Sequence, residues 1–123
     1  MTSEVKILYV DDEQINLLFF RHVFKNKYNV LTAESGFEGL KVLAENPDIK
    51  VIISDMRMPG MDGLQFIRKA KEENPDILFY ILTGYEITPE IQQALEEKLI
   101  LKYLQKPFNV GDIESSISEN LVC

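Results

Sequence analysis

The sequence predicts an α/β protein in which helices cover both faces of a parallel, five-stranded sheet. Five short apolar segments alternate along the chain with five segments whose apolar residues recur at helical spacing. The apolar segments 51–54 and 77–82 lack polar alternation, as expected for strands that are buried on both faces. Strands that alternate with helices form right-handed βαβ units. The 123 residues are enough for one such domain with its own core.

The composition is typical of a globular protein whose partners are proteins or cations. Hydrophobic residues make up 46% of the chain and charged residues 27%. The net charge of −7 argues against nucleic acid as a direct ligand. The longest apolar run is too short to span a bilayer, and the first residues lack the features of a signal peptide. We therefore expect a cytoplasmic protein without membrane insertion, and the single cysteine, Cys123, allows no internal disulfide.

The first predicted strand, 5–10, leads into an acidic turn and a helix over about 14–26. The acids of the turn, Asp11-Asp12-Glu13, could simply cap the helix, because carboxylates are favoured at a helix N-terminus. The helix carries two apolar stripes. The stripe that we expect to face the core consists of Ile15, Leu18, Phe19 and Val23.

The other stripe of this helix, Leu17, Phe20 and Phe24, lies on nearly the opposite side. It is either covered by neighbouring elements or exposed as a docking patch, and the sequence leaves both open. His22, the only histidine, lies towards the first stripe, so we expect a structural role rather than a catalytic one.

The remaining elements follow from apolar spacing and from turn residues. Ser35 and Glu38 match a capping box at the start of the second helix. Asn-Pro pairs end the second and third helices, and a proline begins the fourth. The expected strands are 28–33, 51–54, 77–82 and 102–105; the expected helices start near 35, 64 and 89, and the last spans about 110–121. We see no repeat, linker or effector region, so residues 1–123 are expected to form a single domain.

Polar residues follow four of the predicted strands. Asp11 and Asp12 come after the first strand, Asp55 after the third, Thr83 at the end of the fourth and Lys106 after the fifth. The carboxyl ends of parallel strands meet at one edge of a sheet, where open α/β folds bind ligands. Three acids, a hydroxyl and an ammonium at that edge are suited to a divalent cation and a phosphoryl group.

These residues and their neighbours resemble the receiver domain of two-component response regulators. The segments that carry the resemblance are Asp11-Asp12, Asp55 with Met58-Pro59-Gly60-Met61-Asp62-Gly63, Thr83-Gly84 and Lys106-Pro107-Phe108. They occur in the order and spacing of that family and cover nearly the whole chain. The resemblance implies a flavodoxin-like (βα)5 fold with strand order 2-1-3-4-5 and a role in phosphorelay signalling.

The resemblance implies that Asp55 is the phosphoacceptor and becomes a 4-aspartylphosphate. Asp12, helped by Asp11 through water, would hold Mg²⁺ (or Mn²⁺) together with Asp55 and the backbone carbonyl of Met56. Magnesium takes oxygen ligands and is commonly held by one or two carboxylates plus phosphate oxygens. The cation would also let an anionic donor approach an anionic nucleophile.

Further roles carry over from the family to residues near the strand ends. Thr83 and Lys106 match the pair that binds phosphoryl oxygens, and Tyr103 matches the aromatic residue that turns when Thr83 moves. The Lys106-Pro107 bond is expected to be cis. The large residues Arg57 and Tyr85 occupy positions that tune the loss of the phosphoryl group, and both could shield it from water.

One departure from the family concerns the segment 95–101, which has no glycine where many members have a glycine-containing turn. The fourth helix could therefore run on or be shifted. The acids, the hydroxyl and the lysine show no departure.

We therefore expect a phosphorylatable receiver, a monomer or weak dimer that is not a turnover enzyme. A sensor histidine kinase or a histidine phosphotransfer domain would donate to Asp55, and a downstream protein target would read the result. One alternative is a receiver-shaped interaction module that is never phosphorylated. The other is a Mg²⁺-dependent phosphohydrolase of the haloacid-dehalogenase type, but those enzymes need Asp-x-Asp, and Arg57 stands at the second acid position.

Overall fold

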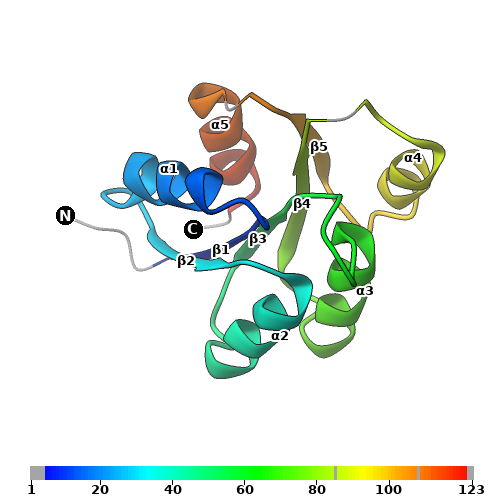
Figure 1. Ribbon diagram of the computed structural model, residues 1–123, viewed down its shortest axis with the longest axis horizontal. Helices are drawn as coiled ribbons and strands as arrows, with labels where there is room; N and C mark the ends of the chain where they lie inside the picture. Colours follow the sequence, from blue (N-terminus) through cyan, green and yellow to red (C-terminus); the bar gives the residue numbers. More distant parts are fainter. Residues whose placement is uncertain (1–4, 85, 108, 122–123) are drawn as a thin grey trace.

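Five parallel strands form one sheet in the order β2-β1-β3-β4-β5 (Figure 1). The structure is a computed structural model that describes residues 5–84, 86–107 and 109–121. The strands are β1 (Lys6–Val10), β2 (Asn29–Ala33), β3 (Val51–Ser54), β4 (Leu78–Thr83) and β5 (Lys102–Gln105). The predicted α/β class and strand order are confirmed.

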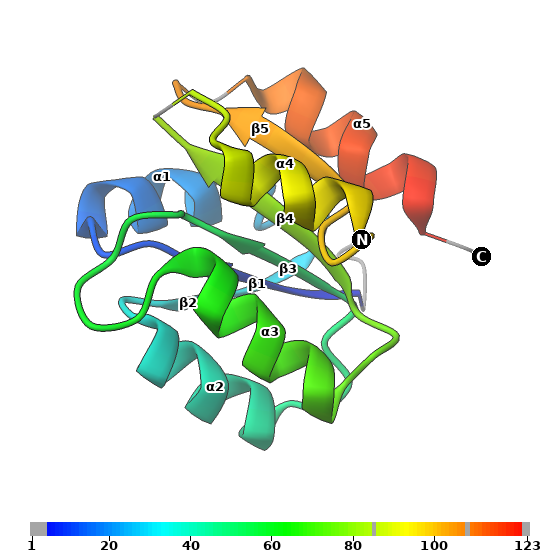
Figure 2. The ribbon, with the colours of Figure 1, turned by 90° about the vertical axis from the view of Figure 1, so that its right-hand side faces the viewer.

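Helices cover both faces of this sheet. They are α1 (Gln14–Phe24), α2 (Gly36–Glu45), α3 (Gly63–Glu73), α4 (Pro89–Glu96) and α5 (Val110–Asn120). Helices α1 and α5 lie on one face, and α2, α3 and α4 lie on the other (Figures 1 and 2). In the part of the chain that the structure describes, none of the helices combines the length and apolar composition needed to cross a bilayer.

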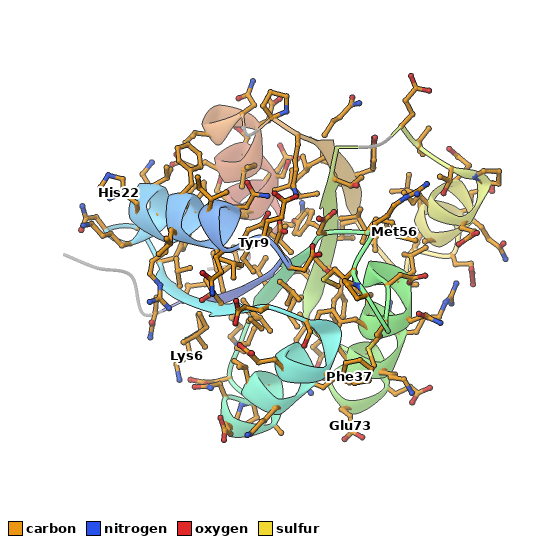
Figure 3. The ribbon with its side chains drawn as sticks, in the orientation of Figure 1. Lys6, Tyr9, His22, Phe37, Met56 and Glu73 are labelled. Atoms are coloured by element: carbon orange, nitrogen blue, oxygen red, sulfur yellow. The ribbon has the colours of Figure 1, made fainter. Side chains whose placement is uncertain are left out.

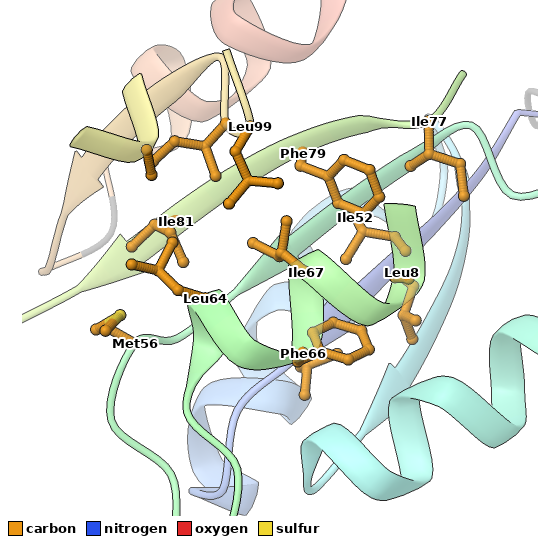
Figure 4. Close-up of a cluster of buried hydrophobic side chains, with 14 of the residues drawn as sticks. Leu8, Ile52, Met56, Leu64, Phe66, Ile67, Ile77, Phe79, Ile81 and Leu99 are labelled. Atoms are coloured by element: carbon orange, nitrogen blue, oxygen red, sulfur yellow. The ribbon is translucent and has the colours of Figure 1, made fainter. Parts of the chain in front are cut away.

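Side chains alternate between two apolar layers, as the period-two geometry of a strand requires. On one face, Leu8, Ile52 and Phe79 pack with Ile67 of α3 (Figure 4). The opposite layer, which faces α1 and α5, includes Tyr9 of β1 and other residues that are buried there: Ile7, Phe20, Phe24, Ile53, Tyr80, Ile113 and Ile117. A sheet that is covered on both faces holds its strands rigidly, so the loops at its carboxyl edge start from fixed positions.

The expected orientation of α1 is wrong. Leu17, Phe20 and Phe24 face the sheet and are at most 7% exposed, whereas Ile15 is 73% and Leu18 68% exposed. The ring of Phe20 stacks on Tyr9 of β1 with centroids 4.5 Å apart, and Phe24 packs against Phe20 at 4.7 Å. Large aromatic rings bury more apolar area than aliphatic side chains, so they decide which stripe faces inward.

The other residues of the stripe that was expected to face the core also point away from the sheet or lie at its margin. Phe19 is 45% exposed, and only Val23 is partly buried. His22 is exposed on α1 rather than packed in the core, and its structural role stays a prediction (Figure 3). The stripe that the sequence left open is covered, and the stripe that was assigned to the core forms the exposed apolar surface of α1.

The helix N-termini match the expectations only in part. Within the described chain, the Glu13 side chain at the N-cap of α1 accepts no capping hydrogen bond; instead the Glu13 amide donates to Asp11 Oδ1 at 2.9 Å. Ser35 does cap α2, accepting from the Glu38 amide at 3.0 Å. The full reciprocal capping box lies at α3, between Asp62 and Gln65, and was not predicted.

Helix α4 does not run on through the segment that lacks glycine. It ends at Glu96, and Lys98 adopts the left-handed conformation with φ of 61°. A lysine thus takes the position that favours glycine, which is how the chain makes this turn without one.

Candidate functional site

The ends of β1, β3, β4 and β5 bring the predicted polar residues to one edge of the sheet. Strand β3 pairs with both β1 and β4, and Asp55 continues the β1–β3 ladder because its amide donates to the Val10 carbonyl at 2.8 Å. The ligand oxygens of Asp11, Asp12 and Asp55 lie within 4.8 Å of one another. The prediction that three separated acids converge is therefore met by the geometry.

Asp11 is fully buried and accepts hydrogen bonds on both carboxylate oxygens. Its Oδ2 accepts from Lys106 Nζ at 2.7 Å and from the Tyr9 hydroxyl at 2.6 Å. The amide nitrogen of Asn16 donates to the same oxygen at 3.1 Å, and the Glu13 amide donates to Oδ1 at 2.9 Å. This buried acid is held in one orientation by donors from β1, from α1 and its N-cap, and from the residue after β5.

Asp55 is 6% exposed and stands between two donors. Its Oδ1 accepts from the Met56 amide at 2.7 Å, and its Oδ2 accepts from Lys106 Nζ at 3.1 Å. Burial raises the pKa of the Asp55 carboxyl; the Lys106 charge opposes that effect, and the Asp11 charge adds to it. A cation bound beside Asp55 would favour its ionised, nucleophilic form.

Lys106 joins two of the acids. Its ammonium contacts Asp11 and Asp55, and its side chain is 15% exposed. Burial alone would lower the pKa of Lys106, but the hydrogen bond to Asp11 and the charges of Asp55 and Asp11 outweigh it, so this pKa is raised. The following peptide bond, Lys106-Pro107, is cis, as the resemblance implied.

The acidic cluster could hold a metal ion. All three side chains offer oxygen, the ligand atom of hard divalent cations. Asp12 is exposed, whereas Asp11 and Asp55 are buried, so the cluster opens towards solvent at Asp12. The Met56 carbonyl, the fourth predicted ligand, accepts from the Gly63 amide at 2.7 Å, which fixes the loop after β3.

The other predicted residues that the structure describes differ in their burial. Thr83 is fully buried at the end of β4. Tyr103 is half-buried in β5 and packs against the apolar layer on the α4 side of the sheet; burial raises the pKa of its hydroxyl. Arg57 is exposed in the loop after β3. Tyr85, like Phe108 of the lysine motif, lies outside the described residues.

Two residues of the site were missed at the level of sequence. Tyr9 and Asn16 both donate to Asp11. A signal for Tyr9 was available, because residues i and i+2 of a strand project from the same face, which places Tyr9 beside Asp11. The Asn16 contact depends on how α1 is rotated about its axis, and that rotation was predicted wrongly.

A model of the response regulator receiver domain matches residues 7–118, and the chain belongs to that family. Sporulation initiation phosphotransferase F of Bacillus subtilis is 31% identical over 118 residues, which are 94% of this chain and 93% of that protein. The hydrogenase transcriptional regulatory protein HoxA of Cupriavidus necator is 31% identical over 106 residues, which are 86% of this chain but only 22% of that protein. The chain thus spans nearly all of one curated relative and under a quarter of another.

Solved structures of this family superpose closely on the chain. Chemotaxis protein CheY4 of Vibrio cholerae has a TM-score of 0.88 and 29% identity, covering 97% of this chain and all (100%) of that one. The response regulator TrrA of Thermotoga maritima, in complex with Mg²⁺-BeF, has a TM-score of 0.81 and 26% identity, covering 95% of this chain and 99% of that one.

Proposed function

We propose that this receiver domain accepts a phosphoryl group on Asp55 in the presence of Mg²⁺ or Mn²⁺. The observation that carries the proposal is the position of the Asp55 carboxylate, which accepts from the Lys106 ammonium at 3.1 Å and offers an oxygen within 4.8 Å of those of Asp11 and Asp12. A cation held by the acids, together with the Lys106 ammonium, would neutralise negative charge on a phosphoryl group at Asp55. The TrrA structure holds Mg²⁺ and a beryllium fluoride, which supports the assignment by similarity.

The proposed donor is a phosphohistidine of a sensor kinase or of a histidine phosphotransfer domain. An oxygen of Asp55 forms a bond to phosphorus while the phosphorus–nitrogen bond breaks, and the electron pair of that bond leaves with the imidazole. A bound divalent cation supplies charge neutralisation for this transfer. Lys106 and the hydroxyl of Thr83 then donate to phosphoryl oxygens, and Tyr103 moves with Thr83.

The exposed apolar surface of α1, formed by Ile15, Leu18 and Phe19, suits the docking of this donor. Helix α1 begins two residues after Asp12, so Ile15 lies within one helical turn of the acidic cluster. A partner that packs on this surface would bring its histidine to the pocket. The downstream target, the oligomeric state and a cytoplasmic location stay predictions, as does shielding of the phosphoryl group by Arg57 and Tyr85.

Labelling with radioactive acetyl phosphate and Mg²⁺ tests the proposal. We expect stable incorporation of phosphate in the wild-type chain, none in Asp55→Asn and none when EDTA replaces Mg²⁺. The matched control is Asp48→Asn, because Asp48 is an exposed aspartate that pairs with Lys6 at the opposite end of β1. That variant should label as the wild type does.

Three outcomes would count against the proposal. Equal labelling of Asp55→Asn and wild type would exclude Asp55 as the acceptor. Absence of labelling, together with no spectral response of Thr83 and Tyr103 to Mg²⁺ and beryllofluoride, would favour an interaction module that is not phosphorylated. Rapid, repeated turnover of p-nitrophenyl phosphate would favour the phosphohydrolase.

A further inference from the structure

The hydroxyl of Tyr9 is a buried polar group that the proposed transfer does not use. It lies in the middle of an apolar strand and donates to Asp11 Oδ2 at 2.6 Å. A buried hydroxyl needs a partner, and a leucine or phenylalanine would have filled the layer without that requirement. The Tyr9 hydroxyl therefore serves its acceptor in the acidic cluster rather than the packing of the core.

The surroundings of Tyr9 hold its hydroxyl in place. The side chain is fully buried, and its ring stacks on Phe20 of α1 with an interplanar angle of 22°. A ring packed in this way cannot turn its hydroxyl towards another acceptor without repacking the layer. The hydrogen bond is thus a fixed constraint on the torsion of the Asp11 side chain.

Asn16 supplies a second constraint on the same oxygen. Its amide reaches Asp11 Oδ2 at 3.1 Å from the first turn of α1. Together with Lys106, the two donors give this oxygen three hydrogen bonds, from β1, α1 and the residue after β5. These three hydrogen bonds hold Asp11 Oδ2 in place, and they fix the carboxylate plane relative to Asp12 and Asp55.

We propose that Tyr9 and Asn16 are positioning residues that orient the Asp11 carboxylate for the cation site and so set its affinity for divalent metal. The inference rests on the proposed function for the presence of that cation. Groups that hydrogen-bond to the carboxylates of a metal site fix the orientation of the ligands, and losing one lowers metal affinity by roughly 10-fold or more. Neither residue touches the reacting atoms in this account.

Calorimetric titration with Mg²⁺ of two matched pairs of variants tests the inference. Tyr9→Phe is compared with Tyr80→Phe, since Tyr80 is also fully buried and its hydroxyl donates to the Ser116 carbonyl at 2.7 Å. Asn16→Ala is compared with Asn120→Ala, because Asn120 also donates its side-chain amide from a helix, to the Tyr80 hydroxyl at 3.1 Å. Each pair removes the same donor, once at the acidic cluster and once away from it.

We expect Tyr9→Phe to bind Mg²⁺ roughly 10-fold more weakly than wild type, with a smaller loss for Asn16→Ala. Tyr80→Phe and Asn120→Ala should bind as wild type does, even where they lower the melting temperature in EDTA. Labelling of Tyr9→Phe by acetyl phosphate should return to the wild-type level at saturating Mg²⁺, since the cation site is weakened and the phosphoacceptor is unchanged.

Equal Mg²⁺ affinity within both pairs would overturn the inference and leave the proposed function standing. If Tyr9→Phe shows no cooperative melt, the comparison of Asn16→Ala with Asn120→Ala decides alone. A wild-type chain that binds no Mg²⁺ and takes no label would overturn the proposed function and the inference together.

Discussion

Gly63 shows how one residue allows the loop of Asp55 to close. A Cβ added there would lie 2.2 Å from the Asp55 carbonyl oxygen and 3.0 Å from Ile81 Cδ1. The Gly63 amide also donates to the Met56 carbonyl at 2.7 Å. Only a residue without a side chain lets the first turn of α3 approach the backbone of the loop so closely.

Gly63→Ala should therefore destabilise the protein by about 1–3 kcal/mol, the usual cost of forcing an extra carbon into a packed site. The matched control is Gly84→Ala, because no described heavy atom lies within 4 Å of a Cβ added at Gly84. Urea unfolding measures both variants. Equal free energies of unfolding for the two alanine variants would contradict this account of the loop.

At the scale of the element, helix α4 ends in a conformation that its sequence does not favour. Lys98 has a φ of 61°, and its carbonyl accepts from Lys71 Nζ at 3.0 Å, which ties this turn to α3. The left-handed conformation places the Cβ of an L-residue close to the following carbonyl, a cost that glycine avoids.

Replacing Lys98 with glycine should raise the free energy of unfolding by roughly 0.5–1 kcal/mol, because relief of strain exceeds the added entropy of the unfolded chain. Gln93→Gly serves as the control, because Gln93 is exposed in the interior of α4, where glycine should lower stability by about 1 kcal/mol. Thermal melts of the two variants give the comparison. A loss of stability in both would mean that the turn carries no strain.

Helix α1 shows why a sequence pattern can predict a helix without predicting how that helix is rotated about its own axis. Both stripes of α1 satisfy helical periodicity, so the pattern predicted the helix correctly and could not choose the buried face. The choice was made by the stacking of Phe20 on Tyr9, a contact between residues of different elements. Asn16 reaches Asp11 only because of that rotation.

At the scale of the whole molecule, the burial of tyrosine hydroxyls makes the free energy of unfolding depend on pH in the alkaline range. Burial raises the pKa of Tyr9, with the Asp11 charge adding to it, and burial is also the main cause of the raised pKa values of Tyr28 and Tyr80. The folded chain holds these protons more tightly than the unfolded chain, whose tyrosines ionise near pH 10. Their contribution to stability is therefore complete below about pH 10 and is lost as the pH rises through the folded pKa values.

We expect the urea midpoint to be level between about pH 7 and about pH 9 and to fall steeply above about pH 10. Tyr80→Phe should show a shallower fall, since it removes one of the groups that ionise only on unfolding. The comparison uses the slopes, because the loss of the Tyr80 hydrogen bond shifts the whole curve. Identical slopes for the variant and the wild type would show that Tyr80 contributes nothing to the alkaline transition.

The α/β class, the five strands and the polar residues that end them were predictable from the sequence, because apolar runs and turn residues are local properties of the chain. The convergence of Asp11, Asp12 and Asp55 followed from the rule that parallel strands end at one edge. Three features became visible only in the folded molecule: the stripe of α1 that is buried, the turn at Lys98 after α4, and the hydrogen bonds from Tyr9 and Asn16 to Asp11. These outcomes depend on packing between elements distant in sequence, and a pattern along one element carries no information about its neighbour.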